Sequence, residues 1–216
     1  MSGMPGEQRF GDDSVWVTKT HYPLTNDDNQ HKADKIIYLA RNPTEIFPSY
    51  AGLLTTAAHS LVPERPWNEY KQFWEFFVDW QSNLMNQYFE FLKKQAQSTP
   101  TYFIRYEDLR LNPEPVLREL FCFMLDVDSI DGTVLEARLK EVCSTDNTTK
   151  TKYALKSNST NLSRNRGLYN AEQWEMLSTR LKSHNYFWGY ANMDIPEELN
   201  KEGAPAKNPT AFFEYD

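Results

Sequence analysis

The sequence predicts an α/β protein whose β-sheet is largely parallel. Three short β-prone runs, which begin near residues 15, 35 and 101, alternate with segments of helical periodicity. Strands that alternate with helices at such spacings are typical of a parallel sheet flanked by helices. At 216 residues, with 40% apolar and 14% aromatic residues, the chain can bury a substantial core. We therefore expect one domain over residues 15–192, with disordered ends at 1–14 and 193–216.

The first two expected strands both end in polar residues. In the run SVWVTKTHYPL, Val15 and Val17 alternate with other residues until Pro23, so the strand tip lies at 19–21. After a polar linker, the run KIIYLA (35–40) leads directly into a helical segment, in which Asn42 can cap and Pro43 suits the first position. Pro48 should kink or end that helix.

The remaining segments complete the alternation. Residues 67–97 show the clearest helical pattern, an apolar stripe in steps of three and four that comprises Phe73, Phe77, Trp80, Leu84, Tyr88 and Phe91. A third strand at 101–106 precedes a helix that opens at Asn112 and has Leu117, Leu120, Phe121 and Met124 on one face. A shorter helix is expected at about 131–143, and one long amphipathic helix within NAEQWEMLSTRLKSHNYFWGY.

Composition excludes several classes of function. The net charge of −7 disfavours non-specific nucleic-acid binding, and two cysteines outside any CxxC pair disfavour a disulfide framework or a structural zinc site. No window approaches the ~20 apolar residues of a membrane helix, and the polar start MSGMPGEQRFGDDS resembles no signal peptide. We expect no nucleic-acid partner, no membrane segment and no metal. The chain as given suits the cytoplasm, and its oligomeric state stays open.

Several polar residues fall where the expected strands end, namely Lys19, His21, Arg41, Arg105 and Tyr106. In open parallel sheets ligands bind at the carboxyl ends of the strands, so these side chains should converge on one edge. An arginine at a strand-to-helix junction favours an anion site, because the first N–H groups of a helix are unpaired. The alternative is that Arg41 is a solvated loop residue.

Other polar residues carry weaker signals. Glu107 and Asp108 are interpreted as turn and cap residues rather than as an acid–base pair, because adjacent side chains of an extended segment point in opposite directions. His31, His59 and His184 lie in linker or polar helix-end contexts, which favours no catalytic role for them.

Three motifs resemble the sulfotransferase family in order, spacing and strand context: KTHYP (19–23), RNPTEIFPS (41–49) and RYEDLRLNPEPVLRELFCFM (105–124). The resemblance covers about residues 15–190. It implies a P-loop-NTPase-like parallel sheet flanked by helices. It also implies transfer of a sulfuryl group from 3′-phosphoadenosine 5′-phosphosulfate (PAPS) to a hydroxyl or amine, without a metal. The acceptor, a small molecule, a glycan or a protein hydroxyl, stays open.

The resemblance also implies roles for individual residues. Arg41 and Ser49 match the pair that holds the 3′-phosphate, a task for which the forked guanidinium is suited. His21 matches the general base that takes the proton of the acceptor hydroxyl. Lys19 matches a residue near the transferred sulfuryl group, where a cation can stabilise the charge on its oxygens.

Two further parts of the nucleotide site follow from the same resemblance. Tyr106 borders the adenine. The segment Arg164-Asn165-Arg166-Gly167 resembles a late basic-glycine segment that closes over the 3′-phosphate, although the spacing from Gly167 to Trp174 is longer than the family pattern. A flexible basic loop is the alternative for that segment.

One family element is missing from the sequence. A first strand and a phosphate loop of the type Lys-Ser-Gly-Thr-Thr should precede the KTH strand, but only about 14 residues do so. We therefore expect a sheet that lacks its first strand and phosphate loop, with an unpaired edge and an uncovered apolar face. Pro48, directly before Ser49, is a second departure.

Three hypotheses stay open at this point. The chain is a sulfotransferase whose sequence lacks its N-terminal exon, in which case a lost anchor would allow a Golgi location. Alternatively, it is a short protein that keeps the 3′-phosphate half-site but is inactive and serves in nucleotide binding or as a scaffold. Third, it belongs to another nucleotide-binding α/β class such as a small kinase, although the sequence shows no clear carboxylate set for magnesium.

Overall fold

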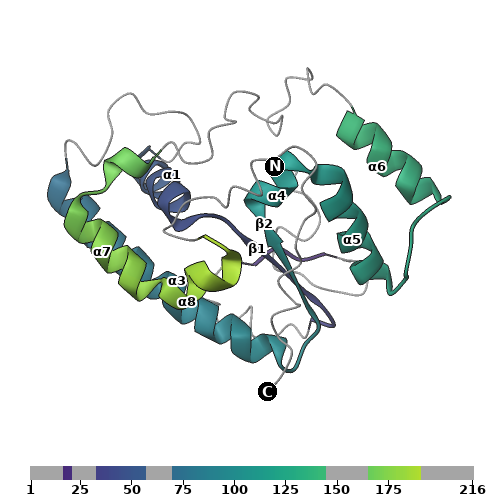
Figure 1. The fold of residues 1–216 in the computed structure, drawn as a ribbon, viewed down its shortest axis with the longest axis horizontal. Helices are drawn as coiled ribbons and strands as arrows, with labels where there is room; N and C mark the ends of the chain where they lie inside the picture. Colours follow the sequence, from purple (N-terminus) through teal and green to yellow (C-terminus); the bar gives the residue numbers. More distant parts are fainter. Residues whose placement is uncertain (1–16, 21–32, 57–69, 145–164, 191–216) are drawn as a thin grey trace.

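The structure, a computed structural model, describes residues 17–20, 33–56, 70–144 and 165–190. Its elements confirm an α/β protein, mostly helical, with a small parallel sheet (Figure 1). In chain order they are β1 (Ile36–Ala40), α1 (Pro43–Thr56), α3 (Lys71–Ala96), β2 (Thr101–Arg105), α4 (Tyr106–Leu111), α5 (Pro113–Leu125), α6 (Val134–Ser144), the 3-10 helix η2 (Arg166–Leu168), α7 (Ala171–Arg180) and α8 (Lys182–Trp188).

The sheet of the described residues consists of β1 and β2 in parallel. Their register pairs Ile36 with Thr101 at one end and Ala40 with Arg105 at the other. Both strands agree with the sequence prediction. Residues 17–20 form no strand, contrary to expectation, and Val17 is 52% exposed, so the apolar alternation there has no core to face. The rest of that expected strand lies outside the described residues.

Helices cover the two faces of the sheet unequally. On one face, Tyr38, Ala40 and Phe103 pack with Leu92, Trp188 and Tyr190. On the other, Tyr102 and Ile104 of β2 pack against Val116 of α5, with Leu109, Leu120 and Phe123 around them. Figure 1 shows α5 and α8 on opposite sides of the strands. On the α5 side of β1, Ile37 and Leu39 are 37% and 53% exposed.

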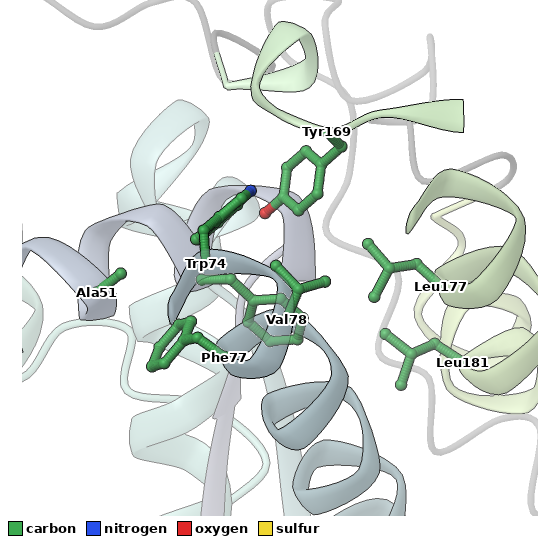
Figure 2. Packing of buried hydrophobic residues seen from close by; sticks show 8 residues of the cluster. Ala51, Trp74, Phe77, Val78, Tyr169, Leu177 and Leu181 are labelled. Atoms are coloured by element: carbon green, nitrogen blue, oxygen red, sulfur yellow. The ribbon is translucent and has the colours of Figure 1, made fainter. Parts of the chain in front are cut away.

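A second core joins α1, α3 and α7. Figure 2 shows Val78 of α3 facing Leu177 and Leu181, with Trp74 and Tyr169 close by. The buried line of α3 differs from the predicted stripe, because Trp80 is 44% exposed whereas Trp74, Phe77, Val78, Gln81, Ser82, Phe89 and Leu92 are buried. Helix α3 packs between α1 and α7. The aromatic side chains of Trp74 and Phe77 belong to the core with these two helices and are buried, whereas that of Trp80 is exposed.

Helix α1 passes through Pro48 without ending, so one of the two outcomes predicted for this proline does not occur. Proline has no N–H, so the carbonyl of Thr44, four residues earlier, loses its donor within the helix. The hydroxyl of Tyr169 donates to that carbonyl at 3.0 Å. Burial, and to a lesser extent the Glu45 carboxylate, raise the pKa of Tyr169 well above its usual value, so the hydroxyl stays protonated and keeps donating. Tyr169, which follows η2, thus supplies the hydrogen bond that α1 lacks at Pro48.

The last predicted helix is divided in two. Asn170 and Gln173 form a reciprocal capping box at the start of α7. Leu181 then departs from helical geometry, with φ −97° and ψ 17°, and α8 follows. The aromatic end of the segment was predicted, and there Trp188 and Tyr190 are buried under the sheet. The division at Leu181 was not predicted, since Leu is a good helix former.

A buried carboxylate connects the end of β1 with the end of α8. Glu107 is 1% exposed and accepts hydrogen bonds from the backbone N–H of Asn42, at 3.0 Å, and from the Tyr190 hydroxyl, at 2.7 Å. Glu107 and Asp108 belong to the first turn of α4 and not to an extended segment. Both are buried structural residues, because each carboxylate accepts bonds from buried donors.

The bond from Tyr190 to Glu107 should stabilise the fold measurably. Tyr190→Phe removes a buried hydroxyl that donates to a carboxylate, and we expect a loss of about 1.5–3 kcal/mol in the free energy of unfolding. Urea denaturation of both proteins measures the difference. Tyr186→Phe is the matched control, because Tyr186 lies on α8, just before Tyr190, is 84% exposed and should change stability little. Equal effects of the two substitutions would contradict the assignment.

His184 is a core residue, not a polar helix-end residue as its sequence context indicated. It is fully buried against Phe89, Trp188 and Tyr190, and its Nδ1 lies 3.1 Å from the Asn185 side-chain oxygen. Burial lowers the pKa of His184 to about 4, although the contact with Asn185 opposes that shift. The imidazole is therefore neutral in the folded protein at neutral pH.

This lowered pKa makes stability depend on pH in a defined window. The unfolded chain binds a proton at His184 below pH ~6.5, whereas the folded protein does so only near pH 4. Neutral His184 therefore contributes its full share to the free energy of unfolding above pH ~6.5. This free energy falls by about 3 kcal/mol as the pH drops toward 4. Thermal unfolding across this range should show a weaker pH dependence for His184→Phe. An unchanged slope would mean that another group titrates there.

Candidate functional site

Arg41 and Tyr106 meet at the carboxyl ends of the two strands. Ala40 and Arg105 are the last paired residues, so Arg41 and Tyr106 follow directly on neighbouring strands. The guanidinium carbon of Arg41 lies 4.6 Å from the centroid of the Tyr106 ring, within the range of a cation–π contact. The Arg41 side chain is 26% exposed. The sequence-predicted convergence therefore holds for these two residues, which present a cation at the rim of the sheet.

Arg105 does not join them, although it was expected to. Its Nε and Nη2 donate to the two Asp108 oxygens at 2.7 and 3.0 Å, and its Nη1 donates to the Trp188 carbonyl at 3.0 Å. The residue is 7% exposed. Side chains two apart on a strand share a face, so Arg105 follows Phe103 into the core beside α8. It is a structural residue.

The start of α1 offers fewer backbone donors than the sequence predicted. Asn42 caps the helix as expected, since its Oδ1 accepts from the Thr44 N–H at 3.0 Å. The Asn42 N–H donates to Glu107, Pro43 has none, and the Glu45 N–H donates to the Asn42 carbonyl at 3.0 Å. These groups are thus already used within the protein. Any anion bound here has to rely on side chains, with Arg41 foremost.

Glu45 is a buried carboxylate beside Arg41 that the sequence analysis missed. It lies four residues after Arg41 and is 2% exposed. Its Oε1 accepts from the backbone N–H of Asn165 at 2.9 Å, and its Oε2 accepts from the Asn165 side-chain amide at 2.8 Å. The distance from Oε2 to Nη2 of Arg41 is 3.7 Å, an ion pair longer than a hydrogen bond. Glu45 therefore joins Asn165, directly before η2, to the start of α1.

The Arg41 guanidinium remains available for a ligand in this arrangement. Within the residues that the structure describes, it donates no hydrogen bond to another side chain or carbonyl, and its contacts are the Tyr106 ring and the Glu45 carboxylate. Phosphate and sulfate oxygens are the ligands that a guanidinium binds through two parallel hydrogen bonds. The local geometry is suited to an anion.

Ser49 lies further along the same face of α1. It is exposed and follows Glu45 by four residues, which places it on the same stripe of α1 as the carboxylate beside Arg41. An exposed hydroxyl on this stripe can donate to an anion that the arginine holds.

The other predicted site residues are less fully described. Lys19 is exposed, whereas His21 and Arg164 lie outside the described residues. Arg166 and Gly167 belong to η2, and the description does not include the Arg166 side chain. Gly167 is exposed, and a Cβ added there would meet no atom within 4 Å, so packing does not require glycine.

No group of three or more His, Cys, Asp or Glu side chains within 17–20, 33–56, 70–144 and 165–190 is arranged to hold a metal ion. None of the helices in the same ranges has the length and apolar character needed to cross a membrane.

Comparison with known proteins identifies the family. A family model for the sulfotransferase domain matches residues 9–182. No curated protein and no solved structure matches the chain. The matched range contains both strands of the described sheet, Arg41, Tyr106 and the Asn165 segment. Since it spans most of the sequence, the chain belongs to the sulfotransferase domain family.

Proposed function

We propose that this protein is a PAPS-dependent sulfotransferase in which Arg41 and Ser49 hold the 3′-phosphate of the nucleotide. The observation that supports this most is the Arg41 guanidinium, which lies over Tyr106 at the strand ends and is partly exposed. Ligands of open parallel sheets bind at this edge. Membership of the sulfotransferase domain family makes PAPS the expected anion.

The residues present fit one end of such a nucleotide. A guanidinium supplies a forked, charge-assisted contact to phosphate, and the exposed Ser49 hydroxyl supplies a further donor on the same stripe. Tyr106 would border the adenine while its ring supports Arg41. Arg164, Arg166 and Gly167 would close over the 3′-phosphate, and the bond from Asn165 to Glu45 supports this role for the segment.

The chemistry follows from the family pattern. When bound, PAPS supplies the sulfuryl group. His21 would take the proton of the acceptor, which we propose to be a hydroxyl or amine of a small molecule, glycan or protein. Lys19 would lie near the sulfuryl oxygens and stabilise their charge. This reaction needs no metal.

Nucleotide affinity should depend on Arg41. Arg41→Ala removes a charged donor and should weaken binding of adenosine 3′,5′-bisphosphate by up to about 3 kcal/mol, or about a hundredfold in dissociation constant. Isothermal titration calorimetry measures this difference. Arg118→Ala is the matched control, since Arg118 also pairs with a glutamate four residues away, Glu114, but on α5. Similar affinities for Arg41→Ala and the unsubstituted protein would refute the assignment.

Transfer should depend on His21 while nucleotide binding does not. His21→Ala should abolish release of adenosine 3′,5′-bisphosphate from PAPS in the presence of a panel of phenols, alcohols, glycans and tyrosine peptides. Its affinity for the product nucleotide should remain that of the unsubstituted protein. His59→Ala serves as a control outside the predicted site. Unchanged turnover in His21→Ala would remove this residue from the mechanism. Nucleotide binding without turnover in the unsubstituted chain would instead favour an inactive nucleotide-binding protein.

A further inference from the structure

We propose that Asn165 is a positioning residue for nucleotide binding that acts through Glu45. By satisfying the buried Glu45 carboxylate, Asn165 keeps the Arg41 guanidinium available for phosphate. This inference rests on the proposed function, because it assigns the phosphate to Arg41. It gives individual roles to Glu45, within the RNPTEIFPS motif, and to Asn165, within the segment from Arg164 to Gly167.

The first step of the argument is competition for Arg41. Glu45, in the first turn of α1, carries a carboxylate four residues after Arg41, which precedes the helix, and the two form an ion pair at 3.7 Å. A carboxylate that formed a forked pair with Arg41 would occupy the very donors that a phosphate needs. A buried carboxylate also requires compensation from donors or cations, so this competition is strong.

The second step is that the Glu45 carboxylate accepts hydrogen bonds from Asn165 and not from Arg41. Its distances to the two Asn165 nitrogens are 2.9 and 2.8 Å, whereas the nearest Arg41 nitrogen lies at 3.7 Å. The two amide donors thus provide hydrogen bonds at ordinary length, and the guanidinium is held at a longer distance. Asn165 thus gives the carboxylate two donors at shorter distances than the nearest Arg41 nitrogen.

The third step is that Asn165 has a fixed position. The segment that follows it is tied to the first turn of α1 by the bond from Tyr169 to the Thr44 carbonyl, at 3.0 Å. The Trp74 indole N–H also donates to the Leu168 carbonyl at 3.2 Å. Because these contacts do not involve the Asn165 side chain, its removal should leave the segment docked. An effect of Asn165→Ala on binding can then be separated from unfolding.

Rescue by a second substitution is the test. Asn165→Ala should weaken binding of adenosine 3′,5′-bisphosphate about tenfold, as Glu45 turns to Arg41. Adding Glu45→Gln, which removes the competing charge but keeps an oxygen for the Asn165 N–H, should restore affinity to within about threefold of the unsubstituted protein. Calorimetry of the four proteins gives this comparison. Glu114→Gln in the Asn165→Ala background is the matched control and should restore nothing, since Glu114 pairs with Arg118.

A purely structural role would give a different pattern. Asn165→Ala would then lower the melting temperature, and Glu45→Gln would lower affinity further or leave it unchanged. Either absence of rescue or unaltered affinity in Asn165→Ala overturns the proposal.

A second measurement does not require the nucleotide. In the free protein, Asn165→Ala should slow exchange of the Arg41 guanidinium protons in NMR spectra, because the guanidinium becomes hydrogen-bonded to Glu45. The double variant should return it to the original rate, and unchanged exchange in Asn165→Ala would overturn the proposal. If the unsubstituted protein fails to bind adenosine 3′,5′-bisphosphate, the proposed function fails, and the exchange rates still decide whether Asn165 controls the Glu45–Arg41 contact.

Discussion

The hydrogen bonds to the Glu107 carboxylate are the constraint on which the site depends. Glu107 belongs to the first turn of α4, directly after β2, and its two acceptor oxygens reach the backbone of Asn42 and the hydroxyl of Tyr190. Three segments far apart in sequence therefore meet at one carboxylate. Since Asn42 follows Arg41 and also caps α1, this contact sets where the helix begins. A buried carboxylate without these donors would be strongly destabilising.

The order of elements could be read from the sequence because it depends on local signals. The runs of β1 and β2 are apolar on both faces, and Asn42–Pro43 and Asn112–Pro113 are good helix starts. Details that depend on packing could not be read in this way. The buried line of α3 depends on having α1 and α7 as neighbours, and His184 is buried although its neighbours in sequence are polar.

The site shows the same division. Arg41 and Tyr106 could be placed together because residues that follow paired parallel strands are neighbours. The prediction for Arg105 was wrong. The strand pattern alone did not reveal that its guanidinium donates to Asp108 and to the Trp188 carbonyl. The contacts of Glu45 with Asn165 and of Thr44 with Tyr169 join residues 120 and 125 positions apart. Nothing in the local sequence marks such pairs, although an acid four residues after an anion-binding arginine is a signal that could be sought.

Pro48 has a consequence for how the chain acquires this structure during synthesis. Helix α1 lacks one of its own hydrogen bonds at this proline, and the replacement donor, Tyr169, is 125 residues further along the chain. A ribosome adds about 5–20 residues per second, so about 6–25 s pass between synthesis of Thr44 and synthesis of its partner Tyr169. Until then, this end of α1 is incomplete and Glu45 lacks the Asn165 donors. The arginine site is consequently one of the last parts of the domain that can mature, after both strands have already been made.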